Sequence, residues 1–295
     1  MGRVVRGVGF ATWVLQVACL GDSVPDATDE VPVLPDVVAV AEGRLFRGAL
    51  SADGLEFYYF VKVAAGEEDY RVYQTRRTNS GWSEPTMLPL GDSSASSMYP
   101  AVSPDGELLV FTSSRSLGGE GGEPGKANLW AARRSDSGWS DPFLLADAST
   151  PENYDAAPWF GPGGRLHFTS TSPDWRESWM RTAPRTSESF GQWTDDPTWA
   201  EMDWPRSTHH FWSGVLNGAG TLAVLELSAR LADGSLDNAD LWVVRRGPMG
   251  WTEAEPLGRD VNTEGVENFP TFAPDDTTLV FVRDFTAFRS VTLRR

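Results

Sequence analysis

Three acidic residues of this chain could carry hydrolytic chemistry: Asp155, Asp203 and Glu267. A pair of carboxyl groups cleaves a glycosidic bond when one donates a proton to the leaving oxygen and the other acts as base or nucleophile. Asp155 and Glu267 each stand two or three residues before a proline that opens an apolar run. Acids in such places also cap strand starts by accepting hydrogen bonds from neighbouring backbone amides. We favour this structural role and keep catalysis as the alternative.

Histidine and aspartate clusters raise the question of a metal site. His209 and His210 are adjacent, and neighbouring residues of a strand point to opposite faces, so the two cannot easily bind one ion. Asp233, Asp237 and Asp240 lie in one loop but lack the spacing of a calcium-binding loop. We therefore expect no cofactor, with calcium at the three aspartates as the weak alternative.

Tryptophans are concentrated between residues 159 and 212. Trp175, Trp199 and Trp204 have no counterpart in the repeats described below, and we expect them in loops or at a sheet edge. Exposed aromatic side chains on a rigid scaffold stack on sugars or anchor a protein partner. Together with His209 and His210, these tryptophans form the candidate binding surface, although packing within loops is the role we favour for the tryptophans.

Composition excludes some functions. The 295 residues carry a formal charge of −16, with a pI near 4.6. Such an acidic surface repels phosphate backbones, so we expect no nucleic-acid partner. Apolar residues make up 40% and charged residues 22%, as in a folded globular protein.

The N-terminal residues have the pattern of an export signal. Residues 1–19 contain two arginines and then a short apolar run that ends at Cys19, the only cysteine. The spelling LQVAC resembles a bacterial lipoprotein signal, in which the cysteine is lipidated, although Gln16 stands where that family prefers leucine. An ordinary signal peptide cleaved nearby is the alternative. Residues 20–29 read as a linker, and residues 30–295 as the folded domain.

Behind these candidates lies an internal repeat. YPAVSPDGELLVFTSSR (99–115) returns as FPTFAPDDTTLVFVRDF (269–285), and related copies start near residues 46, 156 and 212. The period is about 57 residues, and a Gly-Trp turn and an apolar "LW" strand recur in step with it. Each unit therefore reads as four short strands.

Four strands per repeat predict an all-β fold, a single five-bladed β-propeller with four antiparallel strands in each blade. Radial stacking buries both faces of every sheet and leaves only short edges. The last unit has three strands, and EVPVLPDVV (30–38) resembles the missing fourth. We expect this N-terminal strand to join the last blade and close the ring.

The phrases YPAVSPDGELLVFTSSR, NLWAARR with SGWSDP, and ENFPTFAPDDTTLVF resemble the WD40-like repeats of TolB-type propellers. The resemblance implies an envelope or secreted protein that binds a protein or cell-wall component, commonly without catalysis. TolB itself has six blades and an extra domain, so its own partners are not carried over.

The expected function is thus binding or scaffolding in a bacterial cell envelope. The expected partner is an envelope protein or a glycan, and the protein is expected to be a monomer. Its place is the periplasm or cell surface, with a membrane contact only through the lipid on Cys19. The alternative is a secreted glycosidase of the five-bladed type, whose acids converge on the central channel.

Overall fold

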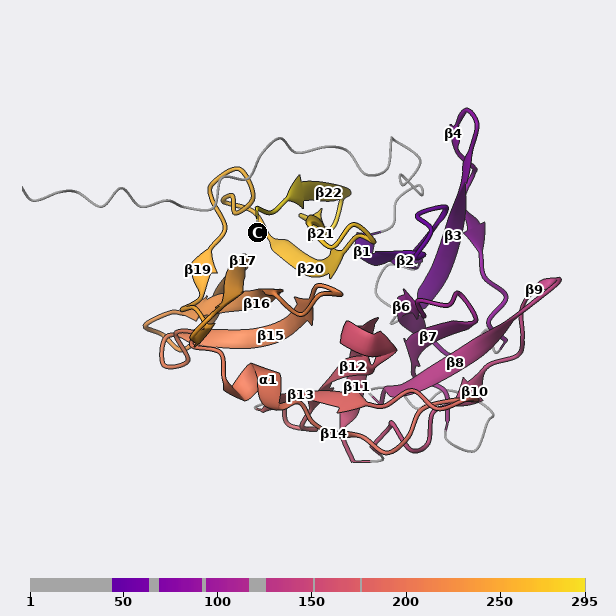
Figure 1. Ribbon diagram of the computed structural model, residues 1–295, viewed down its shortest axis with the longest axis horizontal. Coiled ribbons are helices and arrows are strands. Elements are labelled where there is room, and N and C mark those ends of the chain that lie inside the picture. Colours follow the sequence, from indigo (N-terminus) through magenta and orange to yellow (C-terminus); the bar gives the residue numbers. More distant parts are fainter. Residues whose placement is uncertain are drawn as a thin grey trace, which may run out of the picture.

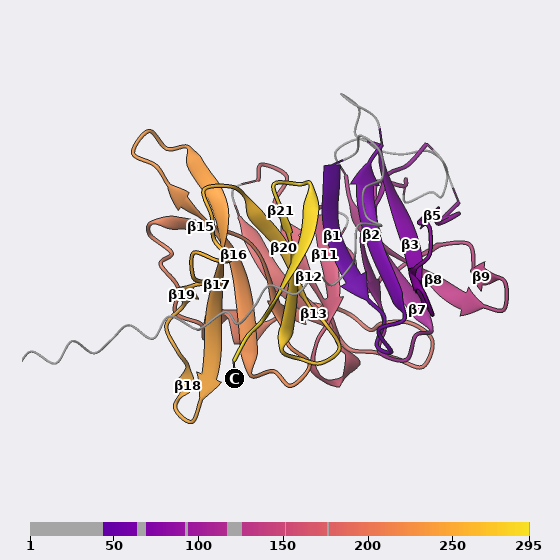
Figure 2. The same ribbon diagram turned by 90° about the horizontal axis from the view of Figure 1, so that it is seen from above.

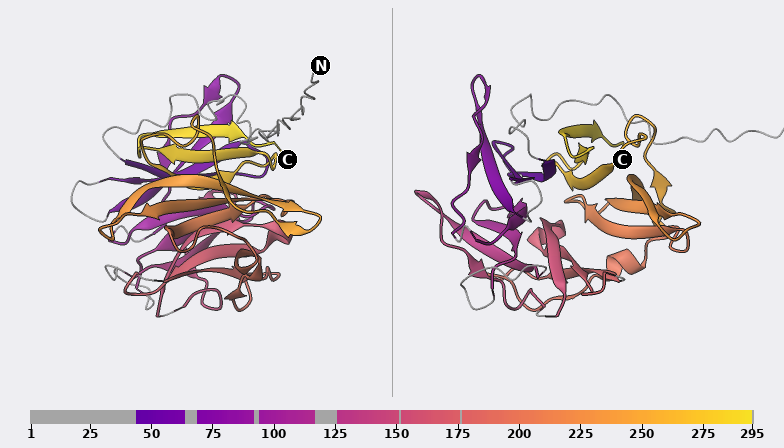
Figure 3. Two further views of the ribbon diagram at one scale, coloured as in Figure 1. Left: turned by 90° about the vertical axis from the view of Figure 1, so that its left-hand side faces the viewer. Right: turned by 180° about the vertical axis from the view of Figure 1, so that it is seen from behind.

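The computed structural model describes residues 44–63, 69–91, 94–116, 126–150, 152–175 and 177–294. Five antiparallel sheets are arranged as blades around a ring (Figure 1), seen from behind on the right of Figure 3. The first described strand lies beside the last sheet, so blades 1 and 5 are neighbours. The fold is the predicted five-bladed β-propeller.

Each blade begins with an inner strand next to the ring axis and continues outward. The inner strands are β1 (Arg44–Leu50), β6 (Ser97–Val102), β11 (Tyr154–Phe160), β15 (His209–Leu216) and β20 (Glu267–Phe272). The second strands are β2 (Glu56–Lys62), β7 (Leu108–Ser113), β12 (Leu166–Thr171), β16 (Leu222–Arg230) and β21 (Thr278–Arg283). The third strands are β3 (Tyr70–Thr78), β8 (Asn128–Ser135), β13 (Ser178–Ala183), β17 (Leu236–Gly247) and β22 (Ala287–Thr292).

The outermost strands are short. The Gly-Trp turns form β4 (Gly81–Trp82), β9 (Gly138–Trp139) and β18 (Gly250–Trp251), and the pieces after them form β5 (Thr86–Met87), β10 (Phe143–Leu144), β14 (Thr194–Asp195) and β19 (Glu255–Pro256). β22 is the outermost described strand of blade 5. The predicted closing strand, residues 30–38, lies outside the described residues, as do the predicted signal, Cys19 and the linker.

Turn chemistry explains why the inner hairpins recur. In blade 2, Ser103 donates from Oγ to Asp105 at 2.5 Å, and Asp105 accepts from the amide of Glu107. Gly106 follows in the left-handed region with φ +76°, which glycine adopts without strain. Blade 1 uses the same device with Ser51 and Asp53.

A bulge interrupts every inner strand, and in blades 2, 3 and 5 it contains a residue followed by proline. The pairing register shifts around Tyr99, Ala157 and Phe269, whose φ angles are +51°, +53° and +57°. Each of these residues precedes a proline, which has no N–H to leave unpaired in the bulge. A bulge bends its strand and redirects side chains. The backbone thus turns at mid-channel in a way that regular alternation does not predict.

The core lies between the blades. β7 is buried along its whole length, with Leu109 and Phe111 packing toward blade 1 and Leu108 and Val110 toward blade 3. This is the burial of both faces that the apolar runs predicted. Among the described residues, no helix is long and apolar enough to cross a membrane.

The fourth strand expected in the third repeat unit, residues 194–201, forms only in part. TDDPTWAE forms the two-residue β14 and then the short helix α1 (Pro197–Ala200). Asp196 caps this helix by accepting from the amide of Thr198, and Pro197 occupies its first position. Asp followed by Pro is a helix-start signal, and here it prevails over the strand pattern of the sister units.

Candidate ligand-binding site

The blades are not evenly spaced. Four of the five neighbouring pairs of inner strands lie in close contact, whereas β11 and β15 are farther apart. A groove of about 550 Å³ opens between blades 3 and 4 on the upper face, which we define as the face where the inner strands begin (top in Figure 2). One wall is β13 with Trp179, and the other is the start of β15 with His209, His210 and Phe211. We call this the blade 3–4 groove.

Trp199 fills the base of the groove. Its ring lies against Gly214 of β15, where an added Cβ would come within 2.3 Å of it. The ring also makes an edge contact with Trp159 and packs on Phe211, with centroids 6.4 and 6.0 Å away. Only 8% of Trp199 is exposed, so this side chain is packed inside the protein and acts as a wedge between blades.

A buried carboxylate fixes the wedge. Asp196 accepts from the indole Nε1 of Trp199 at 3.0 Å and lies 2.9 Å from Nδ1 of His167, which stacks on Trp159. Although burial opposes ionisation, the hydrogen bonds from His167 and Thr198 hold the pKa of Asp196 below its usual value. The network locks α1 against blade 3.

Trp204 is held in the groove from both sides. Arg206 lies over its ring at 4.5 Å, and Phe211 packs on it with centroids 5.7 Å apart. Arg206 also donates to the carbonyls of Trp199 and Met202, so the loop from α1 to β15 has a fixed shape. Trp204 therefore presents a rigid aromatic edge to the groove.

A second, smaller pocket of about 130 Å³ adjoins the groove at the top of the central channel, which we call the upper pocket. Ser178 and His210 line both. At the mouth of the upper pocket, Trp175 is 61% exposed and stacks on Tyr154 with centroids 4.8 Å apart. Trp212, 41% exposed, faces the same pocket and contacts His210 at 4.4 Å.

Arg47 closes the channel below this pocket. Its side chain crosses from blade 1 to blade 3 and donates from Nη1 to the carbonyl of Ala157 at 3.0 Å. Beneath it lies a lower channel of about 260 Å³ lined mostly by apolar residues of all five inner hairpins. Burial lowers the pKa of Arg47 to about 10, against the opposing influence of Tyr99 and Glu226, so the guanidinium remains charged at neutral pH.

Glu226 on β16 is the carboxyl of the upper pocket. Its Oε2 accepts from Ser213 Oγ at 2.9 Å and from the amide of Phe269 at 3.1 Å. Burial raises the pKa of Glu226 to about 7, against those two hydrogen bonds and the charge of Arg47. A buried acid with a perturbed pKa in a concave site marks a functional candidate.

The three acids considered for catalysis are not gathered at the channel. Asp155 is fully buried and accepts from the amide and hydroxyl of Thr150, and burial raises its pKa to about 6. Glu267 is fully buried and accepts from Thr263 and from Arg283. Neither lines a channel pocket, because each turns back to the loop before its own strand.

Asp203 lies elsewhere again. It is exposed, and its backbone pairs with Glu253 beside the outer edge of blade 4. The convergence on the channel mouth that the alternative of catalysis by Asp155, Glu267 and Asp203 would require is therefore not found.

The two candidate histidines, His209 and His210, contact different tryptophans. His209 packs on Trp242, 5.0 Å away, whereas His210 turns to Trp212 and the upper pocket.

On the β16–β17 hairpin, Asp233 accepts from Ser235 and Asp237 from Asn238. Burial and the charges of Glu267 and Asp237 raise the pKa of Asp240 to about 6. Across the described ranges, no three His, Cys, Asp or Glu residues are grouped to hold a metal ion.

The structure thus joins four of the five predicted binding residues, Trp199, Trp204, His209 and His210, in one groove, and places Trp175 in the adjoining pocket. Sequence reasoning missed Arg47 and Glu226, and both carry a signal in the repeat. Glu226 is the one charged residue at a position filled by Phe60, Thr112, Ser170 and Val282 in the other units. Arg47 is the one charged residue at the position that Tyr99, Ala157, Ser213 and Phe269 occupy in the other units.

The sequence matches no protein-family model and no curated protein. Among solved structures, an RGII complex of BT0996 is similar with a TM-score of 0.53 and 11% identity, with 92% of this protein and 92% of that one covered. A "Glycoside hydrolase" gives a TM-score of 0.48 and 10% identity, also over 92% of both proteins. A putative TolB from Agrobacterium tumefaciens gives 0.44 and 16%, over 82% of this protein and 71% of that one.

Three other solved proteins are much longer, and this one spans 46%, 34% and 33% of them. At such low identity the BT0996 structure shows a shared propeller fold and nothing about activity.

Proposed function

We propose that this protein is a non-catalytic glycan-binding propeller of the bacterial cell envelope. The observation that carries the proposal is the continuous site made of the blade 3–4 groove and the upper pocket. It combines exposed or edge-exposed tryptophans with carboxyl and imidazole groups on a rigid scaffold. In this view residues 1–19 direct export, and a lipid on Cys19 holds the monomer at a membrane facing the periplasm or cell surface.

Aromatic faces beside hydrogen-bonding groups are what a sugar chain requires. The apolar face of a pyranose stacks on an indole, while its hydroxyls need acceptors and donors around the rim. Trp175 offers such a face, because its stacking on Tyr154 fixes the indole while leaving 61% of the residue exposed. Its φ of +59° is strained for a bulky residue, and such strain concentrates at functional sites.

Two features favour binding over hydrolysis. A glycosidase places two carboxyl groups on either side of the scissile bond, but Asp155 and Glu267 are each engaged with their own preceding loop. The channel that would hold such a pair is crossed by Arg47 and is largely apolar beneath it. These hydrogen bonds support the structural role that we favour for Asp155 and Glu267 from the sequence.

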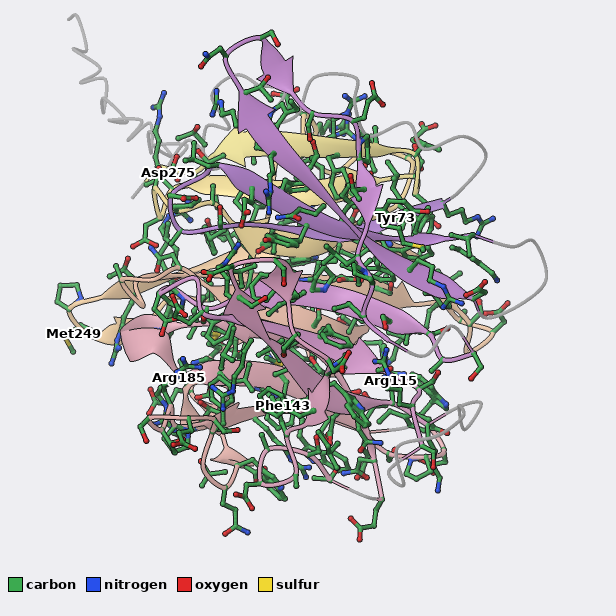
Figure 4. All side chains as sticks on the ribbon, turned by 90° about the vertical axis from the view of Figure 1, so that its right-hand side faces the viewer. Tyr73, Arg115, Phe143, Arg185, Met249 and Asp275 are labelled. Carbon is green, nitrogen blue, oxygen red and sulfur yellow. The ribbon has the colours of Figure 1, made fainter. Side chains whose placement is uncertain are left out.

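A binding and hydrolysis screen with plant and bacterial cell-wall oligosaccharides tests the proposal. We expect a bound oligosaccharide that is not cleaved, and a loss of about tenfold in affinity for Trp175→Ala, since one stacking contact contributes about 1 kcal/mol. Met249→Ala is the control: this side chain is fully exposed at the tip of the β17–β18 hairpin (Figure 4), at the face opposite to the one where the inner strands begin (Figure 2), and it lines neither pocket.

Cleavage that disappears in Asp155→Asn and Glu267→Gln would reinstate the glycosidase. Failure of every oligosaccharide to bind would reject the proposal.

A further inference from the structure

The described residues donate hydrogen bonds to only one of the two carboxyl oxygens of Glu226. Both of its hydrogen bonds end on Oε2, and no described residue donates to Oε1. The side chain is 5% exposed and lines the upper pocket. Oε1 is not fully enclosed by the protein, so it can accept a hydrogen bond from a ligand that brings a donor or a positive charge.

The walls around Glu226 suit a cation. Trp175, Trp212, Tyr99 and Phe269 surround the pocket with aromatic rings, and none of the described lining residues is a lysine or arginine. Ammonium groups bind over aromatic faces, with a larger gain where water is excluded. The formal charge of −16 adds a long-range attraction for cationic ligands.

Arg47 does not satisfy Glu226. Its Nη1 donates to Ala157, its Nη2 is buried without a partner in the described structure, and no ion pair within 4.0 Å joins the two residues. The guanidinium favours the ionised form of Glu226 from a distance. It therefore supports a carboxylate whose second oxygen stays available to a ligand.

We propose that the upper pocket selects a sugar bearing a free primary ammonium group, so that the glycan recognised by the groove is a deacetylated amino-sugar chain. This inference rests on the glycan-binding function proposed above. The ammonium group donates to Glu226 Oε1 between the aromatic walls, and the following sugars extend past Ser178 and His210 into the groove. An N-acetyl group would bring a bulkier neutral amide to the same carboxylate.

The groups around Glu226 predict a distinctive pH dependence. Burial raises the pKa of Tyr99 and, with the charge of Arg230, lowers that of His210, so both remain neutral near pH 7. Arg47 remains charged. Affinity for the amino sugar should therefore rise as Glu226 ionises toward pH 7, and fall again where the amine loses its own proton.

Calorimetry on the full chain near pH 7 tests this selection with three probes: a β-1,4-linked glucosamine tetrasaccharide, its N-acetylated form and cellotetraose. We expect the glucosamine chain to bind about tenfold more tightly than the other two. Glu226→Gln keeps the shape and the bond from Ser213, and should remove this preference and the rise toward pH 7. Glu255→Gln, which removes an exposed carboxylate of β19 that lines neither the groove nor the upper pocket, should preserve both.

The outcomes separate the two proposals. Equal affinity for all three oligosaccharides, or a preference that survives in Glu226→Gln, overturns the ammonium selection and leaves glycan binding intact. If no oligosaccharide binds, both proposals fail, and binding of a lysine-containing peptide instead would identify a protein partner. A melting temperature of Glu226→Gln at or above that of the wild type confirms that the variant is folded.

Discussion

The two sides of the channel fill the bulged part of the inner strands with different side chains. On the side of blades 1, 2 and 5, Phe46, Tyr99 and Phe269 interlock, with centroids 5.6 Å apart for Phe46 and Phe269 and 5.9 Å for Tyr99 and Phe269. On the side of blades 3 and 4, the bulges hold Ala157 and Trp212, and Trp212 donates to Ser228 at 2.9 Å and lines the upper pocket.

The aromatic rings of the first side therefore contact one another, whereas the small side chain of Ala157 leaves the upper pocket open on the other side. A ring of equivalent repeats thus acquires a single asymmetric site without a change of fold. A wedge, Trp199, holds blades 3 and 4 apart, and two neighbouring bulge residues make the opening. Variants that remove these differences between the blades should remove the binding site.

The largest expected effect comes from removing the wedge. Trp199→Ala deletes a buried indole and leaves Asp196 without one of its donors, so the free energy of unfolding should fall by about 3–5 kcal/mol. Urea denaturation measures this loss. A drop below about 1 kcal/mol would mean that blades 3 and 4 are held apart by something other than Trp199.

The next effect concerns the buried carboxyl. The pKa of Glu226 is about 7 in the folded protein against an ordinary value of 4.5, so between these values the folded state binds more protons than the unfolded state. Stability should therefore fall as pH rises through this window, by up to roughly 3 kcal/mol. Glu226→Gln should lack this slope and be the more stable protein at about pH 8. Denaturation at several pH values measures this dependence. If stability falls with pH equally in the wild type and in Glu226→Gln, the raised pKa does not belong to Glu226.

A smaller change should seal the open side. Ala157 has φ +53°, close to the +51° of Tyr99, so Ala157→Tyr suits the backbone already present. The new ring should fill the upper pocket and abolish selection of the amino sugar, while overpacking costs about 1–3 kcal/mol. Calorimetry with the glucosamine tetrasaccharide measures the first effect and thermal unfolding the second. Unchanged affinity would place the ligand outside this pocket.

The repeat made the ring predictable, because each copy carries its own turn chemistry. Unit starts predicted near residues 46, 98, 156, 212 and 268 fall within three residues of the first residues of the inner strands, at 44, 97, 154, 209 and 267. Alternation along a strand was a poorer guide at the channel. The bulges lie just after Asp155 and just after Glu267, so the side chains that reach the axis come from the bulges themselves.

The site was predictable only in part. Loss of the repeat pattern drew attention to Trp175, Trp199 and Trp204, because residues that build blades recur and residues that bind a ligand need not. Whether each tryptophan is exposed depends on how closely two neighbouring sheets approach. Trp199 is buried because it lies between blades 3 and 4. The Asp-Pro helix start before it was the local clue. Glu226 is hidden in an apolar strand, and only comparison with the sister strands reveals it.

Arg47 also has a consequence for the order of assembly. Its partner, Ala157, comes 110 residues later and belongs to a blade that is not adjacent. Hydrogen bonds within a blade join segments close in sequence, so single blades can form early, whereas a contact of this separation must wait for three blades to be in place. The rim of the molecule can be built blade by blade, but its centre is completed only when blades 1 and 3 face each other.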